Sequence, residues 1–185
     1  MMMPTIETGR LWLRPFTPQD APTMHQILNG PDVLKYFPGP QTVTEAQVAR
    51  MISRMLAHWQ EHGYGLWAVA QRTTGALLGR CGLQLIAETN EVEIDFILAP
   101  ACWGQGFATE AGQASLKFGF AQLKLPEVVG IVHPENRASQ RVLQKLGMQF
   151  NQVTEYFGMA VHRYIKTQPD FADTITKKLD ADKRG

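Results

Sequence analysis

The sequence has few cysteines, no strong excess of either charge and no long apolar run. Its two cysteines, Cys81 and Cys102, cannot build a disulfide framework, and neither has metal-ligand spacing to the other or to a histidine pair. Lysine and arginine number 18 against 17 acidic residues, so no global field attracts nucleic acid or an anionic membrane. No stretch reaches the ~18 apolar residues of a membrane span, and the start lacks the pattern of a secretory signal. We therefore expect a cytoplasmic protein without a metal, nucleic-acid or membrane partner.

The length of 185 residues suits one compact domain and is short for two. We place this domain at residues 8–167. The remaining residues, 168–185, are charged and alternate poorly, so we expect a C-terminal extension that is loosely ordered or helical.

Hydrophobic periodicity predicts an α/β protein with a mixed sheet. Two strand-like runs and then a third follow one another in the first half, which predicts an antiparallel meander, whereas strands and helices alternate in the second half, which implies local parallel pairing. The expected strands cover residues 11–16, 66–71, 77–85, 92–98, 128–132, 150–156 and 161–165, and the expected helices start at Pro18, Thr44, Gly104 and Asn136.

The third predicted helix carries a stripe of small residues. Ala108, Gly112, Ser115 and Gly119 recur at spacings of three and four, which places them on one face. Glycine lowers helix propensity, so its presence there is best explained by close approach of the helix axis to a sheet.

A glycine-containing turn connects the fourth predicted strand to this helix. Gly104 and Gly106 allow backbone N–H groups to turn inward, and the start of a helix adds partial positive charge, so a diphosphate could bind there. Two glycines before a helix are also compatible with an ordinary turn. The third glycine of the dinucleotide fingerprint and the Gly-Lys-Ser/Thr of a Walker loop are both missing, which disfavours another nucleotide.

Three segments in register make the pattern specific. They are Trp103-Gly104-Gln105-Gly106-Phe107-Ala108-Thr109, the opening Thr8-Gly9-Arg10-Leu11-Trp12-Leu13-Arg14-Pro15 with Asp20, and Asn136-Arg137-Ala138-Ser139 with the run 142–148. Together they resemble the GNAT superfamily of N-acetyltransferases, in particular its RimJ/RimL-type branch, over residues 8 to 166.

The resemblance implies a fold and a cofactor. The fold would be a twisted, mostly antiparallel mixed sheet of six to seven strands with about four helices and a V-shaped splay between the fourth and fifth strands. The cofactor would be acetyl-CoA, the acyl donor, with no metal. The cofactor-binding residues it implies are Phe96, Ile97, Leu98, Trp103, Gly104, Gln105, Gly106, Phe107, Ala108, Thr109, Asn136 and Ser139. Trp103 stands where the broader family has Gln or Arg, so backbone donors would do most of the phosphate binding.

The chemistry of amine acetylation needs a proton acceptor and a group to meet the departing thiolate. Glu93 and Asp95 lie two apart on one strand and so face the same side of the sheet. By resemblance Glu93 is the base, and Asp95 remains an alternative or a substrate contact. The tyrosine that many relatives use as an acid is replaced by Leu143, and Ser139 takes the place near the thiol. Lacking a motif match, His58, His62 and His133 are more simply structural.

The resemblance implies that the acceptor is a primary amine. A protein N-terminal α-amine has a pKa of about 7.7 to 8.0 and offers more neutral nucleophile than a lysine at about 10.4, which leans toward protein N-termini. A small-molecule amine such as a polyamine, an aminoglycoside or an amino acid, and a catalytically silent acyl-CoA-binding module, stay as alternatives. The aromatic residues Tyr36, Phe37 and Tyr156 would border the acceptor groove. Both a monomer and a homodimer are compatible with the sequence.

Overall fold

The computed structural model describes residues 3–168, so the predicted C-terminal extension lies outside the described residues apart from Gln168. The eight strands within this range belong to one sheet in the order β1-β2-β3-β4-β5-β6-β8-β7, and neighbours pair antiparallel except β5 and β6, which are parallel. The strands are β1 (Ile6–Glu7), β2 (Leu11–Arg14), β3 (Leu66–Gln71), β4 (Leu77–Ile86), β5 (Glu91–Leu98), β6 (Glu127–Val132), β7 (Gln149–Tyr156) and β8 (Met159–Thr167). This confirms the predicted mixed sheet. Sequence analysis missed β1, because two residues are too few to show a period.

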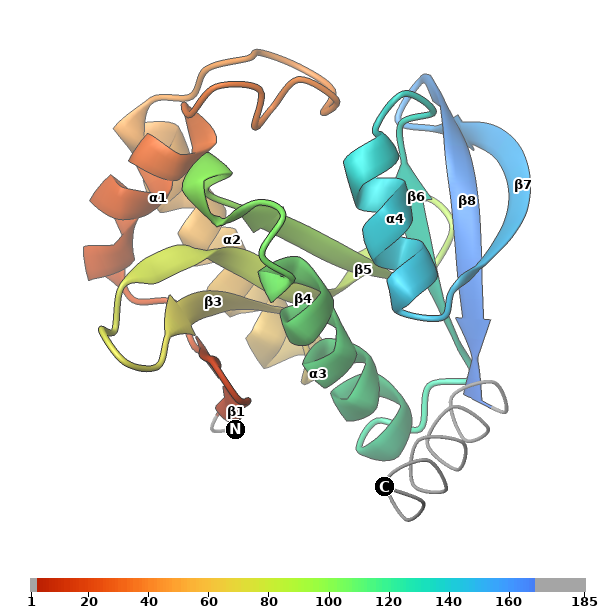
Figure 1. Cartoon of the computed structure of the whole chain (residues 1–185), viewed down its shortest axis with the longest axis horizontal. Coiled ribbons are helices and arrows are strands. Elements are labelled where there is room, and N and C mark those ends of the chain that lie inside the picture. Colours follow the sequence, from red (N-terminus) through yellow and green to blue (C-terminus); the bar gives the residue numbers. More distant parts are fainter. Residues whose placement is uncertain (1–2, 169–185) are drawn as a thin grey trace.

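Four α-helices and two short 3-10 helices accompany the sheet in the described residues. Figure 1 shows α3 in front of the sheet and α2 behind it. None of these helices combines the length and the apolar character needed to cross a bilayer. The α-helices are α1 (Ala21–Leu28), α2 (Glu45–His62), α3 (Phe107–Ala121) and α4 (Arg137–Lys145), and the 3-10 helices are η1 (Pro18–Asp20) and η2 (Pro100–Cys102).

Local sequence explains where two of these helices begin. At α2, Thr44 Oγ1 accepts a hydrogen bond from Gln47 N and Gln47 Oε1 accepts one from Thr44 N, at 3.2 and 2.7 Å. This capping box satisfies free amides of the first turn. Helix α3 begins at Phe107, three residues after the predicted Gly104, because Gly104 and Gly106 have φ angles of 75° and 81° that a right-handed helix excludes.

The two faces of the sheet have separate cores. On one face α1 and α2 pack against Ala68 and Ile97, and on the other α3 packs against Trp67 and Val69. Alternate residues of β3 thus serve opposite cores, as expected for a strand covered on both sides.

Strands β5 and β6 separate soon after they meet. Within residues 3–168 they pair at a single register position, Glu93 with Val129, although β5 continues to Leu98. Figure 1 shows β6, β8, β7 and α4 forming one side of the molecule and β1–β5 the other. The divergence is the splay predicted between the fourth and fifth strands of the sequence analysis, and it opens the sheet beside the second half of β5.

The small residues of α3 bring it close to its neighbours, as predicted. A Cβ built on Gly112 would lie 2.8 Å from Leu146 of the α4 end and 3.4 Å from Ile94 of β5, and one built on Gly119 would lie 2.8 Å from Leu83 of β4. Larger side chains would therefore push α3 away from the sheet that positions the turn before it.

Replacing Gly112 by leucine should destabilise the protein by roughly 1–3 kcal/mol through overpacking. The matched control is Gln113→Leu, one residue along the same helix and exposed, which should change stability by about 0.5 kcal/mol or less. Urea unfolding monitored by circular dichroism measures both. Equal stability of the two variants would contradict the tight packing of α3.

Candidate active site

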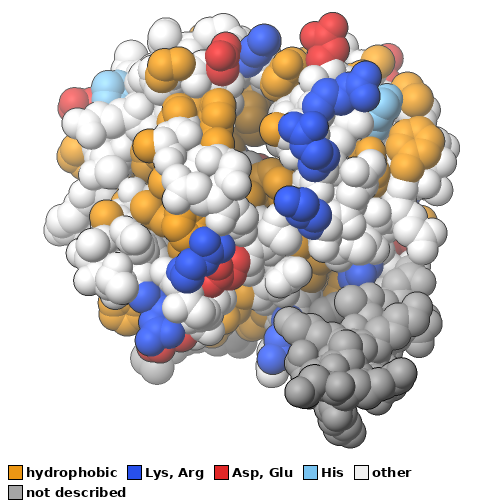
Figure 2. Space-filling model, in the orientation of Figure 1, with side chains coloured by type: hydrophobic (Ala, Val, Ile, Leu, Met, Phe, Trp, Pro, Cys, Tyr) orange, Lys and Arg blue, Asp and Glu red, His pale blue; other side chains and the backbone are white. Residues whose placement is uncertain are grey.

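A cavity of about 670 Å³ occupies the gap between β5 and β6. Figure 2 shows the corresponding hollow at the centre of this face of the molecule, with hydrophobic side chains inside it. The predicted site residues that line it are Tyr36, Phe37, Glu93, Asp95, Phe96, Ile97, Leu98, Trp103, Gly104, Gly106, Phe107, Ala108, Thr109, Asn136 and Ser139. Residues from distant parts of the sequence therefore meet in one cavity.

The cavity extends through the sheet from one face to the other. All six consecutive residues 93–98 line it, although successive side chains of a strand point to opposite faces. Glu93 and Asp95 share the face of Ile97, which packs with α1 and α2, whereas Ile94 and Phe96 contact the cores of the α3 face. A ligand that follows the edge of β5 can thus reach both faces.

The turn before α3 lies at the α3 side of this cavity. Gly104 and Gly106 are exposed, and a Cβ on Gly104 would meet no atom within 4 Å. The side chain of Trp103 is held at the end of β5, because its indole Nε1 donates a hydrogen bond to Leu98 O at 2.8 Å. An open turn of glycines at a helix start presents backbone N–H groups to an anion, so the residues present fit the diphosphate of coenzyme A.

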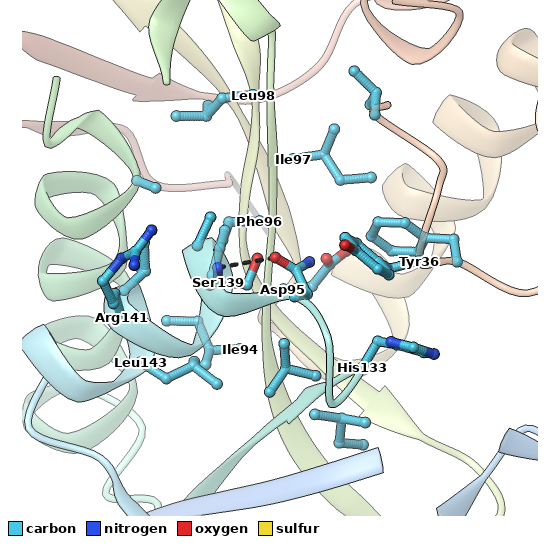
Figure 3. A pocket seen from close by; sticks show the side chains of 18 of the residues that line it. Tyr36, Ile94, Asp95, Phe96, Ile97, Leu98, His133, Ser139, Arg141 and Leu143 are labelled. Atoms are coloured by element: carbon cyan, nitrogen blue, oxygen red, sulfur yellow. Dashed lines mark hydrogen bonds between the residues drawn. The ribbon is translucent and has the colours of Figure 1, made fainter. Parts of the chain in front are cut away.

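Helix α4 forms the opposite wall. Asn136 caps the helix, since its Oδ1 accepts from Ser139 N at 3.1 Å, which leaves its amide nitrogen for other partners. In Figure 3, Ser139 lies between Tyr36 on one side of the cavity and Arg141 on the other. Arg141 and Lys145 also line the cavity, and Figure 2 shows basic side chains gathered over α4.

Two buried carboxylates lie at the sheet. Each of Glu93 and Asp95 is 8% exposed. Gln84, directly opposite on β4, donates to Glu93 Oε2 at 3.0 Å. Arg80 Nη2 is 2.6 Å from Asp95 Oδ2, a close ion pair that lacks hydrogen-bond alignment, so this oxygen and Arg80 Nε have no hydrogen-bond partner in the described part of the chain.

The two carboxylates differ in the groups that offset the cost of burying their charge. Burial, together with the negative charge of Asp95, raises the pKa of Glu93 to about 8, while Gln84 and Arg80 oppose this shift. Asp95 has the arginine beside it. Glu93 therefore carries a proton through much of the neutral range, and only its ionised form, which becomes abundant near pH 8, can accept a proton.

Aromatic residues close the cavity on the side of the carboxylates. Tyr36 stacks on His133 with ring centroids 5.0 Å apart, so the connection between α1 and α2 touches the end of β6 across the gap. Phe37 and Phe157 line the same cavity. Figure 3 shows Tyr36 and His133 on the same side.

Two predicted site residues do not line the cavity. Tyr156 donates its hydroxyl hydrogen bond to Glu91, so the groove is bordered by its neighbour Phe157. Gln105 is exposed, and its side-chain Nε2 donates to Ala101 O at 2.7 Å. In both cases a hydrogen bond holds the side chain outside the cavity.

Sequence analysis missed Arg80, Gln84 and Arg141, and it interpreted His133, which lines the cavity, as structural. The turn between β4 and β5 fixes the register of these two strands, so counting outward from the turn could have placed Gln84 opposite Glu93. No local pattern brings His133 to Tyr36, because that contact depends on the splay. His58 is structural, since Tyr64 O and Leu85 N bind its two ring nitrogens.

A family model described as an acetyltransferase (GNAT) domain matches residues 10–149. The chain therefore belongs to the GNAT family of acetyltransferases. YkkB of Bacillus subtilis (strain 168), uncharacterized, is 32% identical over 165 residues, 85% of this chain and 92% of that protein. YoaA of the same organism, an uncharacterized N-acetyltransferase, is 32% identical over 149 residues, 80% of this chain and 84% of that protein.

The similarity extends to solved structures. An acetyltransferase from Agrobacterium tumefaciens str. C58 aligns with a TM-score of 0.81 and 27% identity over 91% of this chain and 96% of that one. RimL, a ribosomal L7/L12 alpha-N-protein acetyltransferase in complex with coenzyme A, shares the fold with a TM-score of 0.76 at 17% identity, over 89% of this chain and 98% of that one. A spermidine N-acetyltransferase from Vibrio cholerae, in complex with CoA and spermine, does so with a TM-score of 0.73 at 20% identity, over 89% and 99%. The predicted GNAT fold is thus confirmed.

Glu93→Gln should stabilise the protein relative to wild type, increasingly as the pH rises. The pKa of Glu93 is raised from 4.5 to about 8. The contribution of its protonated carboxyl to the free energy of unfolding is therefore complete below pH 4.5 and is lost as the pH rises to about 8. The difference in Tm between variant and wild type should grow from pH 5 to 8 and then level off. Thermal unfolding at unit pH steps measures it.

The control for this series is Glu155→Gln, at an exposed position of β7. Its Tm difference from wild type should stay nearly constant across the same range. A constant difference for Glu93→Gln as well would show that the Glu93 carboxyl is not held protonated by burial.

Proposed function

We propose that the protein transfers the acetyl group of acetyl-CoA to a primary amine by direct attack in a ternary complex, with Glu93 as the base. One observation carries this proposal: a single cavity contains both the glycine turn before α3 and the buried carboxylate of Glu93. Acetyl-CoA supplies an activated thioester. The chain supplies anion-binding amides on one face of the sheet and a proton acceptor on the other.

Each residue has a defined role in the proposal. The turn around Gly104 and Gly106 binds the diphosphate, and the second half of β5, free of β6, offers backbone groups to the pantetheine arm. Glu93 accepts the amine proton, directly or through water. Ser139 hydrogen-bonds the departing thiolate, a role that suits a hydroxyl better than proton donation does.

The acceptor we favour is a weakly basic amine, such as a protein N-terminal α-amine. Burial raises the pKa of Glu93 toward the pKa of about 7.7 to 8.0 of an α-ammonium, which favours proton transfer from that group. An alkylammonium at about 10.4 is a weaker acid and passes its proton less readily.

The charges of the cavity lining support this choice over a polyamine. The lining contains the basic residues Lys35, Arg80, Arg141 and Lys145 against the acidic residues Asp32, Glu93 and Asp95. Since Asp95 is paired with Arg80 and Glu93 holds a proton near neutrality, little negative charge is left to attract a polycation.

Thiol release from acetyl-CoA tests the enzymatic activity, and it is measured with an acceptor amine whose own pKa lies well below 8, so that the acceptor does not titrate in the range of Glu93. At saturating substrates kcat should rise about tenfold per pH unit below 8 and level off above, because Glu93 must be unprotonated. Glu93→Gln should lower kcat roughly 10²–10⁴-fold and remove the inflection. Ser139→Ala, which leaves the carboxylates intact, should keep the inflection. Calorimetric binding of acetyl-CoA without thiol release for any amine would instead identify a silent binding module.

Asp95→Asn decides between the two carboxylates. The charge of Asp95 raises the pKa of Glu93 and the charge of Arg80 lowers it, so this change should move the inflection of kcat to lower pH. Loss of the inflection in Asp95→Asn, with its retention in Glu93→Gln, would make Asp95 the base.

A panel of acceptors tests the substrate class. We expect kcat/KM to be highest for peptides with free N-termini and lower for the same peptides N-terminally blocked but carrying a lysine, for spermidine and for an aminoglycoside. The order should hold at pH 7, and the differences in kcat/KM should narrow at pH 9, where alkylamines are less protonated. Spermidine as the best substrate at both pH values would contradict the N-terminal assignment and favour the small-molecule alternative.

A further inference from the structure

Arg10, between β1 and β2, lies behind the turn that we assign to the diphosphate. Its Nη1 donates to Gln105 O at 2.9 Å, and its guanidinium carbon lies 4.3 Å from the centre of the Phe107 ring. Arg10 does not line the cavity, whereas Gly104 and Gly106 do. The arginine therefore contacts the turn from the side opposite the proposed ligand.

The bond to Gln105 O fixes the orientation of one peptide plane. In a trans peptide the carbonyl oxygen and the following N–H lie on opposite edges of the plane. Holding Gln105 O on Arg10 thus directs the N–H of Gly106 away from Arg10, toward the cavity side. Gly106 accommodates this orientation with a φ of 81°.

Glu110, in the first turn of α3, holds Arg10 in place. One of its oxygens accepts from Thr8 Oγ1 at 2.6 Å and from Arg10 N at 2.8 Å, and the other accepts from Arg10 Nε at 2.7 Å. Burial alone would raise the pKa of Glu110, but the hydrogen bonds from Thr8 and Arg10 outweigh it and hold the pKa below its ordinary value. The anchor is therefore charged at neutral pH.

We propose that Arg10 is a positioning residue for acetyl-CoA: anchored by Glu110, it holds the Gln105–Gly106 peptide so that its N–H faces the diphosphate. This inference rests on the proposed function, because it assigns the diphosphate to this turn. A bare surface ion pair would contribute little. Here the arginine also bonds a loop carbonyl and stacks on Phe107, which makes the conformation of the turn depend on it.

The test compares two acyl donors that differ in the diphosphate. Arg10→Gln should raise KM for acetyl-CoA roughly ten- to hundredfold, the range for losing a charged hydrogen bond, with kcat unchanged. For S-acetylpantetheine, which lacks the diphosphate, kcat/KM should be the same in variant and wild type. Arg10→Lys, which keeps the charge but not the forked geometry, should raise KM for acetyl-CoA by less.

Arg72→Gln is the matched control. Arg72 is also exposed and binds the same N-terminal segment, donating from Nη1 to Thr8 O at 2.7 Å, but it has no bond to the turn. Its KM for acetyl-CoA should equal that of wild type, and the Tm of each variant should be recorded beside its kinetics.

Three results would overturn the proposal. They are an unchanged KM for acetyl-CoA in Arg10→Gln, an equal loss with S-acetylpantetheine, and an equal effect of Arg72→Gln. Failure of the proposed function has a different signature, because wild type itself would then release no thiol from acetyl-CoA with any amine.

Discussion

The divergence of β5 from β6 is the constraint on which the site depends. Two parallel strands that stayed paired would satisfy each other's backbone groups and leave no room between them. Here their pairing is limited to Glu93 and Val129 in the described residues, and β6 continues instead as the partner of β8. A half-strand with free backbone groups in the middle of a sheet is costly unless a ligand pairs with it, which is why we assign the pantetheine arm to this edge.

The splay also determines the electrostatics of the cavity. Because the gap cuts through the sheet, side chains of β5 that would be in the α1–α2 core reach the cavity while remaining buried. Glu93 and Asp95 therefore have a low-dielectric environment and a like charge next to them, yet also the direct contacts of Gln84 and Arg80. Burial and the charge of Asp95 outweigh the contacts of Gln84 and Arg80, so the pKa of Glu93 stays above its ordinary value.

Much of the fold was predictable, because its signals are local. Alternation located the strands from β2 onward, and glycine spacing identified the close packing of α3 and the turn before it. The two carboxylates followed from a separation of two residues on a strand. Contacts between distant segments were not predictable: the stacking of Tyr36 on His133 and the bond from Arg10 to Gln105 O join residues about a hundred positions apart. Gln105 shows the limit of a motif, since its backbone carbonyl and not its side chain makes the contact with Arg10.

The geometry further favours direct transfer over a covalent acyl-enzyme. The proposed diphosphate turn and the carboxylates lie on opposite faces of the sheet, so donor and acceptor can enter from different sides and meet at the edge of β5. A covalent route would need an activated nucleophile at that meeting point. Burial raises the pKa of the Cys81 thiol to about 12, and Cys102 lies beside the turn, on η2, with its own pKa raised by burial. Burial thus disfavours the nucleophilic thiolate form of both cysteines, whereas direct attack by a neutral amine needs no protein nucleophile.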